Sequence, residues 1–316
     1  MARRHGWNLD PEWLVTSPGV IPALYHAVRT FTQPGAGVLV MTPVYYPFFA
    51  AIRDPGREMV ECPLLDRGGR YEIDFEQLEI LARDPKNQLL ILSSPHNPVG
   101  RCWRRAELER ISEICLKNHV FVIADEIHHD LILPGHTHTV FSTLAPDVAW
   151  NCMVCTSPSK TFNLAGMQTS NIVIQDPERR AKFRQTMQLS GLRATNVLGY
   201  RACELAYSRA EPWLDAFLTL LERNRRQVET FFHESLPKIK PYPLEGTYLQ
   251  WLDFRALGRS QAELDDFLVR RARWFVDSGA DFGNPGVGFE RLNLACPEQV
   301  LRDALVRLKN ALESIS

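Results

Sequence analysis

The sequence contains no apolar run as long as the roughly 18 residues that a membrane-spanning helix requires. Its first residues, MARRHGWNLD, include basic side chains, but they are not followed by the apolar stretch of a secretory signal. The chain also lacks an excess of either charge, since 36 Lys and Arg residues face 37 Asp and Glu residues. We therefore expect neither a membrane nor a nucleic acid as a partner.

An even set of cysteines, as a disulfide framework would require, is also missing. The chain has seven cysteines scattered along its length, which is typical of reduced thiols in a cytoplasmic protein. Cys152 and Cys155 have the C-x-x-C spacing of redox and metal sites, but both lie in the apolar run CMVC. We expect this pair to be buried in a strand and to have neither role.

Short apolar runs alternate with amphipathic stretches over the first two thirds of the chain. Helix-spaced apolar residues occur over 20–31, directly after SPG, and over 106–117. This alternation predicts βα units and a mostly parallel sheet with helices on both faces. The clearest strands are VLVM (38–41), LLIL (89–92), VFVIA (120–124) and CMVCT (152–156).

The pattern changes near residue 211. One long amphipathic helix is expected over 211–234, followed by a strand at 247–254, a helix around 261–276, a strand at 289–296 and a closing helix. A long connecting helix that leads into a small α+β unit indicates a second domain. We predict a large domain over 1–212 and a small C-terminal domain over 213–316.

Polar side chains follow each predicted strand. In an open α/β sheet the ligand lies outside the carboxyl ends of the strands, so these side chains should surround one site. Pyridoxal phosphate suits this set, because its aldehyde needs a lysine for a Schiff base, its ring nitrogen a carboxylate, and its phosphate hydroxyls and helix N–H groups. The residues are Tyr45, Asn97, Asp125, His128, Ser157, Ser159 and Lys160.

Two alternatives apply to these residues. Lys160 could be an ordinary solvated loop lysine, although a lysine held in a dry pocket has a lowered pKa and becomes a usable nucleophile. The histidines of HHDLILPGHTH, at 128, 129, 136 and 138, could bind a metal. The intervening LILPG, however, has the pattern of a strand and a turn rather than of a preformed cage. We expect no metal site.

The motifs HNPVG, ADEIHHDL, TSPSKTFNLAG and RLNLAC, in this order and spacing, resemble the fold-type I aminotransferase superfamily. More narrowly, they resemble its MalY/PatB branch of cystathionine, or cysteine-S-conjugate, β-lyases, and the resemblance runs from RHGW almost to the C-terminus. It implies a three-layer αβα PLP-dependent transferase fold with a smaller α+β C-terminal domain. It also implies pyridoxal 5′-phosphate as the cofactor, an amino acid as the substrate and a homodimer.

The resemblance also assigns roles around the cofactor ring. It implies that Lys160 forms the Schiff base and that Asp125 keeps the pyridine nitrogen protonated. Asn97 would bind the phenolate oxygen of the cofactor, and His128 would lie where aminotransferases commonly have a tyrosine on that oxygen. Tyr45 would stack on the ring.

At the two ends of the site the resemblance assigns the anion-binding groups. Ser157 and the backbone N–H groups of Gly19, Val20 and Ile21 would bind the phosphate, and Arg291 would bind the α-carboxylate of the substrate in a bidentate pair. Asn97 would contact the substrate as well.

The sequence departs from the family at two places. Many of these aminotransferases have an arginine at the position of Gln168, and its absence is shared with the MalY-like branch. The chain is also shorter at its N-terminus, where family members carry an arm and an aromatic residue that reaches the partner's site. We expect this chain to lack that arm.

Three functions are compatible with these residues. Proton removal from Cα followed by loss of a thiolate from Cβ would be a carbon–sulfur β-lyase reaction, which the MalY/PatB branch favours. The same residues would serve a class I/II aminotransferase. A non-catalytic, PLP-binding regulatory protein is the third alternative.

Overall fold

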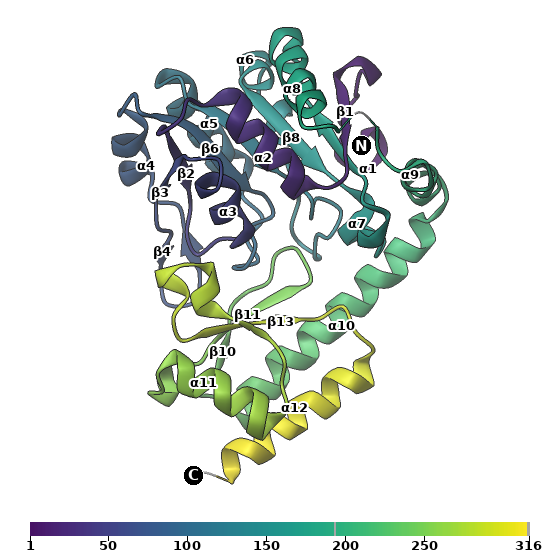
Figure 1. Ribbon diagram of the computed structural model, residues 1–316. Helices are drawn as coiled ribbons and strands as arrows, with labels where there is room; N and C mark the ends of the chain where they lie inside the picture. Colours follow the sequence, from purple (N-terminus) through teal and green to yellow (C-terminus); the bar gives the residue numbers. More distant parts are fainter. Residues whose placement is uncertain (193, 315–316) are drawn as a thin grey trace.

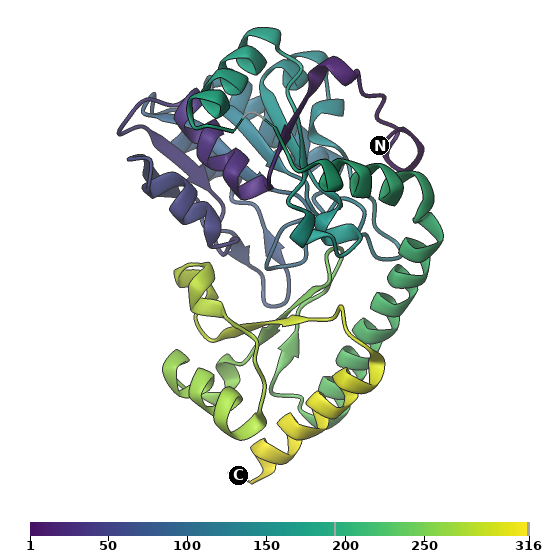
Figure 2. The ribbon, with the colours of Figure 1, turned by 45° about the vertical axis from the view of Figure 1, so that its right-hand side comes forward.

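The structure is a computed structural model that describes residues 1–192 and 194–314. Figure 1 and Figure 2 show a larger part around the main sheet, a smaller part below it, and the long helix α10 running from one to the other. The strands are β1 (Leu14–Ser17), β2 (Gly37–Val40), β3 (Glu58–Glu61), β4 (Leu65–Asp66), β5 (Tyr71–Glu72), β6 (Asn87–Ser93), β7 (Phe121–Asp125), β8 (Cys152–Thr156), β9 (Ser170–Val173), β10 (Lys240–Pro241), β11 (Leu249–Asp253), β12 (Asp277–Ser278) and β13 (Phe289–Asn293). The α-helices are α1 (Ala2–His5), α2 (Val20–Phe31), α3 (Pro47–Arg53), α4 (Phe75–Ala82), α5 (Arg105–Lys117), α6 (Pro146–Trp150), α7 (Pro158–Thr161), α8 (Pro177–Leu189), α9 (Val197–Arg209), α10 (Glu211–Ser235), α11 (Gln261–Phe267) and α12 (Glu298–Glu313). Within the described part of the chain, no helix is both long and apolar enough to cross a membrane.

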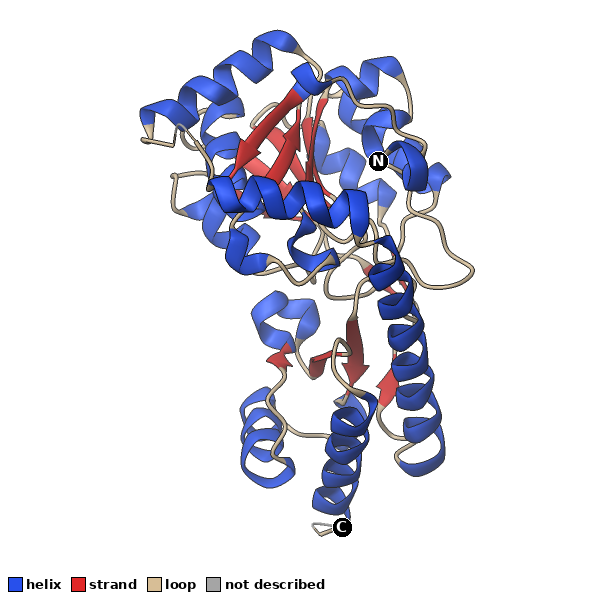
Figure 3. Cartoon of the chain, turned by 90° about the vertical axis from the view of Figure 1, so that its right-hand side faces the viewer, coloured by secondary structure: helices blue, strands red, loops and turns tan. Residues whose placement is uncertain are grey.

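The main sheet has seven strands in the order β1-β9-β8-β7-β6-β2-β3. All neighbouring pairs from β8 to β3 are parallel, and β9 runs antiparallel to both β8 and β1. Helices cover both faces (Figure 3). Alternation along each strand explains why: in β6, Leu90 and Leu92 pack with α4 and α5, while Leu89 and Ile91 pack with α2 and α3. The predicted three-layer αβα fold is confirmed.

The smaller part contains an antiparallel sheet in the order β10-β11-β13-β12. Figure 1 shows α12 lying along α10 on one side of this sheet, with α11 on the other side of the lower part. The prediction of a helix over 261–276 is wrong at its C-terminal end. There α11 passes into a π-helical turn, η5 (Leu268–Ala272), and the helix stops. Arg273 leaves the helix with a φ of 53°. Trp274 is then held by its indole N–H, which donates to the Ala304 carbonyl at 2.6 Å.

A buried ion cluster joins the two parts just before β11. Glu245 accepts hydrogen bonds from Arg101 Nε at 3.1 Å and from the Cys102 N–H at 3.0 Å, while Arg101 also pairs with Glu107 at 3.0 Å. The next residue must be a glycine, because a Cβ on Gly246 would lie 2.6 Å from Cys102 Sγ. Apolar packing reinforces the junction, where the ring centroid of Tyr71 on β5 lies 5.4 Å from that of Tyr242 and 6.4 Å from that of Phe289. The division of the chain between residues 212 and 213, next to the start of α10, stays our proposal.

Residues on β13 alternate between two environments. Arg291 belongs to the cavity described below, whereas Glu290, 1% exposed, lies against α11, where Gln261 Nε2 donates to its Oε1 at 2.9 Å. Burial and the neighbouring Asp265 carboxyl raise the pKa of Glu290 to about 9. The folded protein therefore holds a proton on Glu290 at neutral pH.

Because Glu290 holds this proton in the folded protein, we expect the free energy of unfolding to depend on pH. Because the folded-state pKa lies above the ordinary value of about 4.3, the contribution of Glu290 is fully present below about pH 4.3 and is lost as the pH rises through about 9. Glu290→Gln imitates the protonated acid, so its stability advantage over the parent should grow between pH 5 and 8.5. Denaturant unfolding at both pH values measures this, with the exposed Glu234→Gln as control. An advantage that does not change with pH would contradict the assignment.

Candidate active site

A cavity of about 390 Å³ lies between the carboxyl ends of the parallel strands and the small sheet. The main sheet contributes its strand ends and the loops after them, as open α/β sheets usually do. The cavity brings together every residue that the sequence predicted for cofactor or substrate: Gly19, Val20, Ile21, Tyr45, Asn97, Asp125, His128, Ser157, Lys160 and Arg291. Their individual roles stay predictions.

Lys160 lies in α7, the short helix that directly follows β8. Ser157 caps this helix, since its Oγ accepts a hydrogen bond from the Ser159 N–H at 3.1 Å. Burial and the nearby positive charge of Arg291 lower the pKa of Lys160, and the Asp125 carboxylate opposes this shift. A lowered pKa leaves more of the amine neutral, which is the form that attacks an aldehyde. The solvated-loop alternative for Lys160 does not fit this partly buried place in the cavity.

Asp125 ends β7 and is almost completely buried. Burial raises its pKa to about 7, although its Oδ1 accepts a hydrogen bond from the Ile127 N–H at 3.2 Å. A carboxyl group in this state gains most from a cationic partner within the cavity. The protonated nitrogen of a pyridine ring is such a partner.

His128 is a second buried group in the cavity wall, and it is neutral. Burial, together with the positive charges of Lys160 and Arg291, lowers its pKa to about 3. Its Nδ1 has no hydrogen-bond partner among the described residues. Its ring meets that of Tyr248 edge to face, with the centroids 5.8 Å apart. A buried polar atom without a partner is costly, and an acceptor or donor on a bound ligand would satisfy it.

Arg291 enters the cavity from β13 and is fixed on two sides. Its Nη1 donates to Asn97 Oδ1 at 2.7 Å, and its Nε and Nη2 donate to Asp277 Oδ2 at 3.1 and 2.7 Å. The Phe282 ring lies against the guanidinium, 4.7 Å from Cζ to the ring centroid. This buried, oriented guanidinium is the strongest carboxylate-binding group in the cavity wall.

A second anion-binding site, in addition to Arg291, lies at the start of α2. The first turn of this twelve-residue helix has backbone N–H groups without intrahelical partners, and Gly19 is its N-cap. Ser157 adds a hydroxyl that donates to the Thr169 carbonyl at 2.8 Å. Gln168 lies in the same wall, with a φ of 47°.

The small sheet and its connections contribute residues that the sequence reasoning missed, namely Tyr248, Asp277 and Asn293. Asn293 is two residues after Arg291 on the same strand, so alternation could have found it, whereas Tyr248 directly precedes β11 and alternation does not indicate it. Asp277 lies in a strand of only two residues, β12, which has no recognisable pattern.

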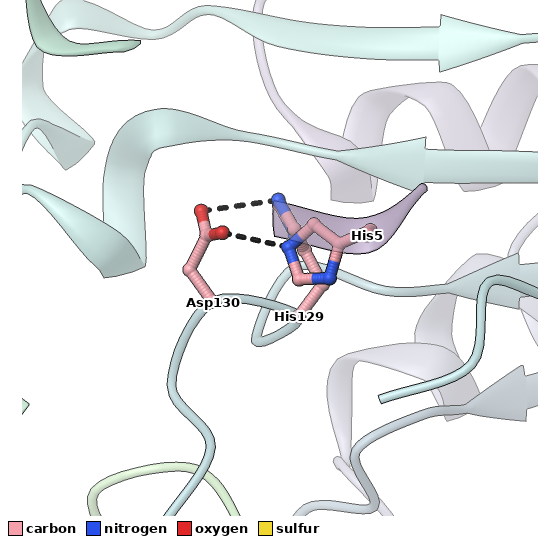
Figure 4. Close-up of side chains that lie close together, drawn as sticks. All are labelled: His5, His129 and Asp130. Carbon is pink, nitrogen blue, oxygen red and sulfur yellow. Dashed lines mark hydrogen bonds and ion pairs between the residues drawn. The ribbon is translucent and has the colours of Figure 1, made fainter. Parts of the chain in front are cut away.

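Figure 4 shows a cluster of imidazole and carboxylate groups formed by His5, His129 and Asp130. Asp130 is 2.8 Å from His5 Nε2 and 3.1 Å from His129 Nε2, and it accepts a hydrogen bond from Thr161, next to Lys160, at 3.2 Å. Because His129 Nδ1 donates to the Glu126 carbonyl at 2.7 Å, its Nε2 faces Asp130 favourably only when protonated. The pKa of His129 is raised accordingly, because the Asp130 charge outweighs the effect of burial. Asp130 thereby connects His5 and His129 with Thr161, the neighbour of Lys160 in α7.

These groups fit pyridoxal phosphate. An amine with a lowered pKa, a buried acid with a raised pKa, an imidazole nitrogen without a hydrogen-bond partner among the described residues and a helix N-terminus surround one cavity. They correspond to the aldehyde, the ring nitrogen, the ring oxygen and the phosphate of that cofactor.

Comparisons with known proteins agree with this geometry. The family model for aminotransferase class I and II matches residues 1–308. Cystathionine β-lyase PatB of Bacillus subtilis is 45% identical over 99% of this chain and 81% of its own length, and MalY of Escherichia coli is 29% identical over 99% and 80%. The crystal structure of cystalysin from Treponema denticola, which contains a pyridoxal 5′-phosphate cofactor, superposes with a TM-score of 0.98 at 45% identity, covering 100% of this chain and 80% of cystalysin.

The family that the motifs predicted is thereby confirmed, and so is the likeness to the MalY/PatB branch. The chain belongs to the aminotransferase class I and II family.

Proposed function

We propose that the protein is a pyridoxal-phosphate-dependent carbon–sulfur β-lyase. It would cleave cystathionine or another cysteine S-conjugate to a thiol, pyruvate and ammonia. The observation that carries this proposal is the convergence of ten residues, predicted from the sequence, on one cavity of a chain that is 45% identical to a cystathionine β-lyase. The C–S lyase of Staphylococcus hominis, 30% identical with a TM-score of 0.92, adds support.

Each residue has a defined task in this reaction. When bound, pyridoxal phosphate supplies the electron sink that makes the proton on the substrate Cα removable. Lys160 holds the cofactor before the substrate arrives, and its freed amine then takes the Cα proton as a general base. Arg291 binds the α-carboxylate and so fixes the Cα–H bond near that amine. Asp125 keeps the ring nitrogen protonated.

The remaining contacts orient the reactants. Asn97 holds Arg291 through its Oδ1, which leaves its amide N–H₂ group free to donate to the ring oxygen. Tyr45 limits the cavity beside the ring. Elimination expels the sulfur substituent as a thiolate from Cβ, whereas transamination would use the same residues to return a proton. The names of the relatives support elimination.

We further propose a cytoplasmic homodimer. The cysteines in the described part of the chain are free thiols, which suits a reducing compartment. Large apolar side chains are exposed where α8 ends, at Leu189, and where α9 begins, at Val197 and Leu198. A second copy of the chain is a suitable cover for such a surface.

The test is an assay of the purified protein with added pyridoxal phosphate. Cystathionine and S-alkyl cysteines should release thiol and pyruvate in equal amounts, and cystine should release a cysteine persulfide together with pyruvate. Formation of a new amino acid from an added 2-oxo acid, without pyruvate release, would indicate an aminotransferase. A cofactor absorbance band without turnover of any substrate would indicate a binding protein.

Replacing Lys160 by alanine should abolish the covalent attachment of the cofactor, because no other amine in the cavity can form it. Borohydride reduction of the parent should add the cofactor mass to the peptide that contains Lys160, as mass spectrometry would show. The exposed Lys182→Ala is the control and should be labelled like the parent. Labelling of a different peptide in the parent would refute the assignment.

Asp125→Asn should retain the cofactor but lower kcat about 10²- to 10³-fold, the usual scale of a lost electrostatic contact in an active site. A neutral amide cannot stabilise the protonated ring nitrogen, whereas the fold tolerates the isosteric change. The exposed Asp147→Asn is the matched control. If kcat stays within tenfold of the parent while the cofactor is bound, Asp125 is not the partner of the ring nitrogen.

A further inference from the structure

Arg291 already has a carboxylate partner that belongs to the protein. Three of the five N–H donors of its guanidinium are engaged, two with Asp277 Oδ2 and one with Asn97 Oδ1. The pairing is built into the small sheet, because Asp277 of β12 lies opposite Arg291 of β13 in the strand register. Asp277 therefore reaches the guanidinium from a fixed position.

The two partners differ in exposure. The Arg291 side chain is 9% exposed, whereas the Asp277 side chain is 42% exposed and lines the same cavity. Before a ligand binds, the two charges balance. When a substrate α-carboxylate shares or takes over the guanidinium, two carboxylates face one cation, and the solvent-facing Asp277 carries the excess negative charge.

That excess charge must affect which substrates bind. The sulfur substituent begins one carbon beyond Cα, and a short flexible substituent has the reach to place its end group beside the residue that adjoins the α-carboxylate. A positive end group there would restore the charge balance, whereas a negative one would add a third carboxylate to the same place.

We infer that Asp277 is a specificity-determining residue that favours cysteine S-conjugates with a cationic sulfur substituent and disfavours anionic ones. The inference rests on the proposed lyase function, because it names the substrate class of that site. It assigns to Asp277 a task separate from the chemical step, since Asp277 contacts Arg291 and the substituent rather than the reacting atoms.

The test compares three conjugates of similar size: S-(2-aminoethyl)-cysteine, S-(2-hydroxyethyl)-cysteine and S-carboxymethyl-cysteine. The parent should show its highest kcat/KM with the amine and its lowest with the carboxylate. Asp277→Asn should lower the amine-to-hydroxyl ratio of kcat/KM about fivefold, the factor that one partly exposed charge pair of about 1 kcal/mol gives, and should lower the amine-to-carboxylate ratio further, because the repulsion of the carboxylate is lost as well. Because the ratio is taken within one preparation, a loss of folded protein cancels.

Two control variants sharpen this result. Asp277→Glu keeps the charge and should keep the preference, whereas Asp281→Asn removes an exposed charge outside the cavity lining and should leave the ratio unchanged. An Asp277→Asn ratio equal to that of the parent would overturn the inference.

A binding measurement separates this inference from the proposed function. Dissociation constants of the three conjugates are measured by calorimetry on the cofactor-loaded Lys160→Ala protein, with and without Asp277→Asn, so that no turnover is needed. Loss of the amine preference in the double variant supports the role of Asp277 even if the parent proves not to be a lyase. Equal affinities for all three conjugates in the Lys160→Ala background refute that role, whatever the reaction is.

Discussion

The active-site cavity depends on one buried carboxylate, Glu245, which fixes the small sheet against the large one. Its oxygens are held by Arg101, by the Cys102 N–H and by Arg70 at 2.8 Å. An arginine that is 2% exposed tolerates its desolvation only while its anionic partners stay in place, so the cluster ties the segment before β11 to the large part. Since Arg291 comes from the small sheet and Asn97 from the large one, this cluster sets the width of the site.

The electrostatics of the cavity follow from the same burial. Burial disfavours the charged form of each group, so it lowers the pKa of Lys160 and raises that of Asp125. The cavity wall therefore holds an amine and an acid whose charged forms are both disfavoured by burial. A ligand that combines an aldehyde carbon with a cationic ring nitrogen interacts favourably with both Lys160 and Asp125. Burial of these two groups costs free energy, and binding of such a ligand offsets that cost.

The sequence predicted the part of the fold in which burial leaves a strong pattern. Strands β6, β7 and β8 are buried along nearly their whole length and were evident as apolar runs, and the rule on strand ends then located Asn97, Asp125 and Lys160. Strands β1, β3 and β9 were missed because they have four residues each and incomplete burial. Asp277 could not be predicted, because its place opposite Arg291 depends on the pairing of β12, a strand of only two residues that has no recognisable pattern.

The buried cysteines have a consequence for a protein that releases thiols. Burial raises the pKa of all seven thiols, to about 12 for Cys62, Cys102 and Cys115. Thiolates are the species that attack disulfides, so the five buried side chains, Cys62, Cys102, Cys115, Cys152 and Cys155, are nearly inert at neutral pH. A lyase acting on cysteine conjugates or on cystine would produce thiols and encounter disulfides continually. Its buried cysteines would stay out of that exchange, and the protein would resist mixed-disulfide formation with its substrates and products at these positions.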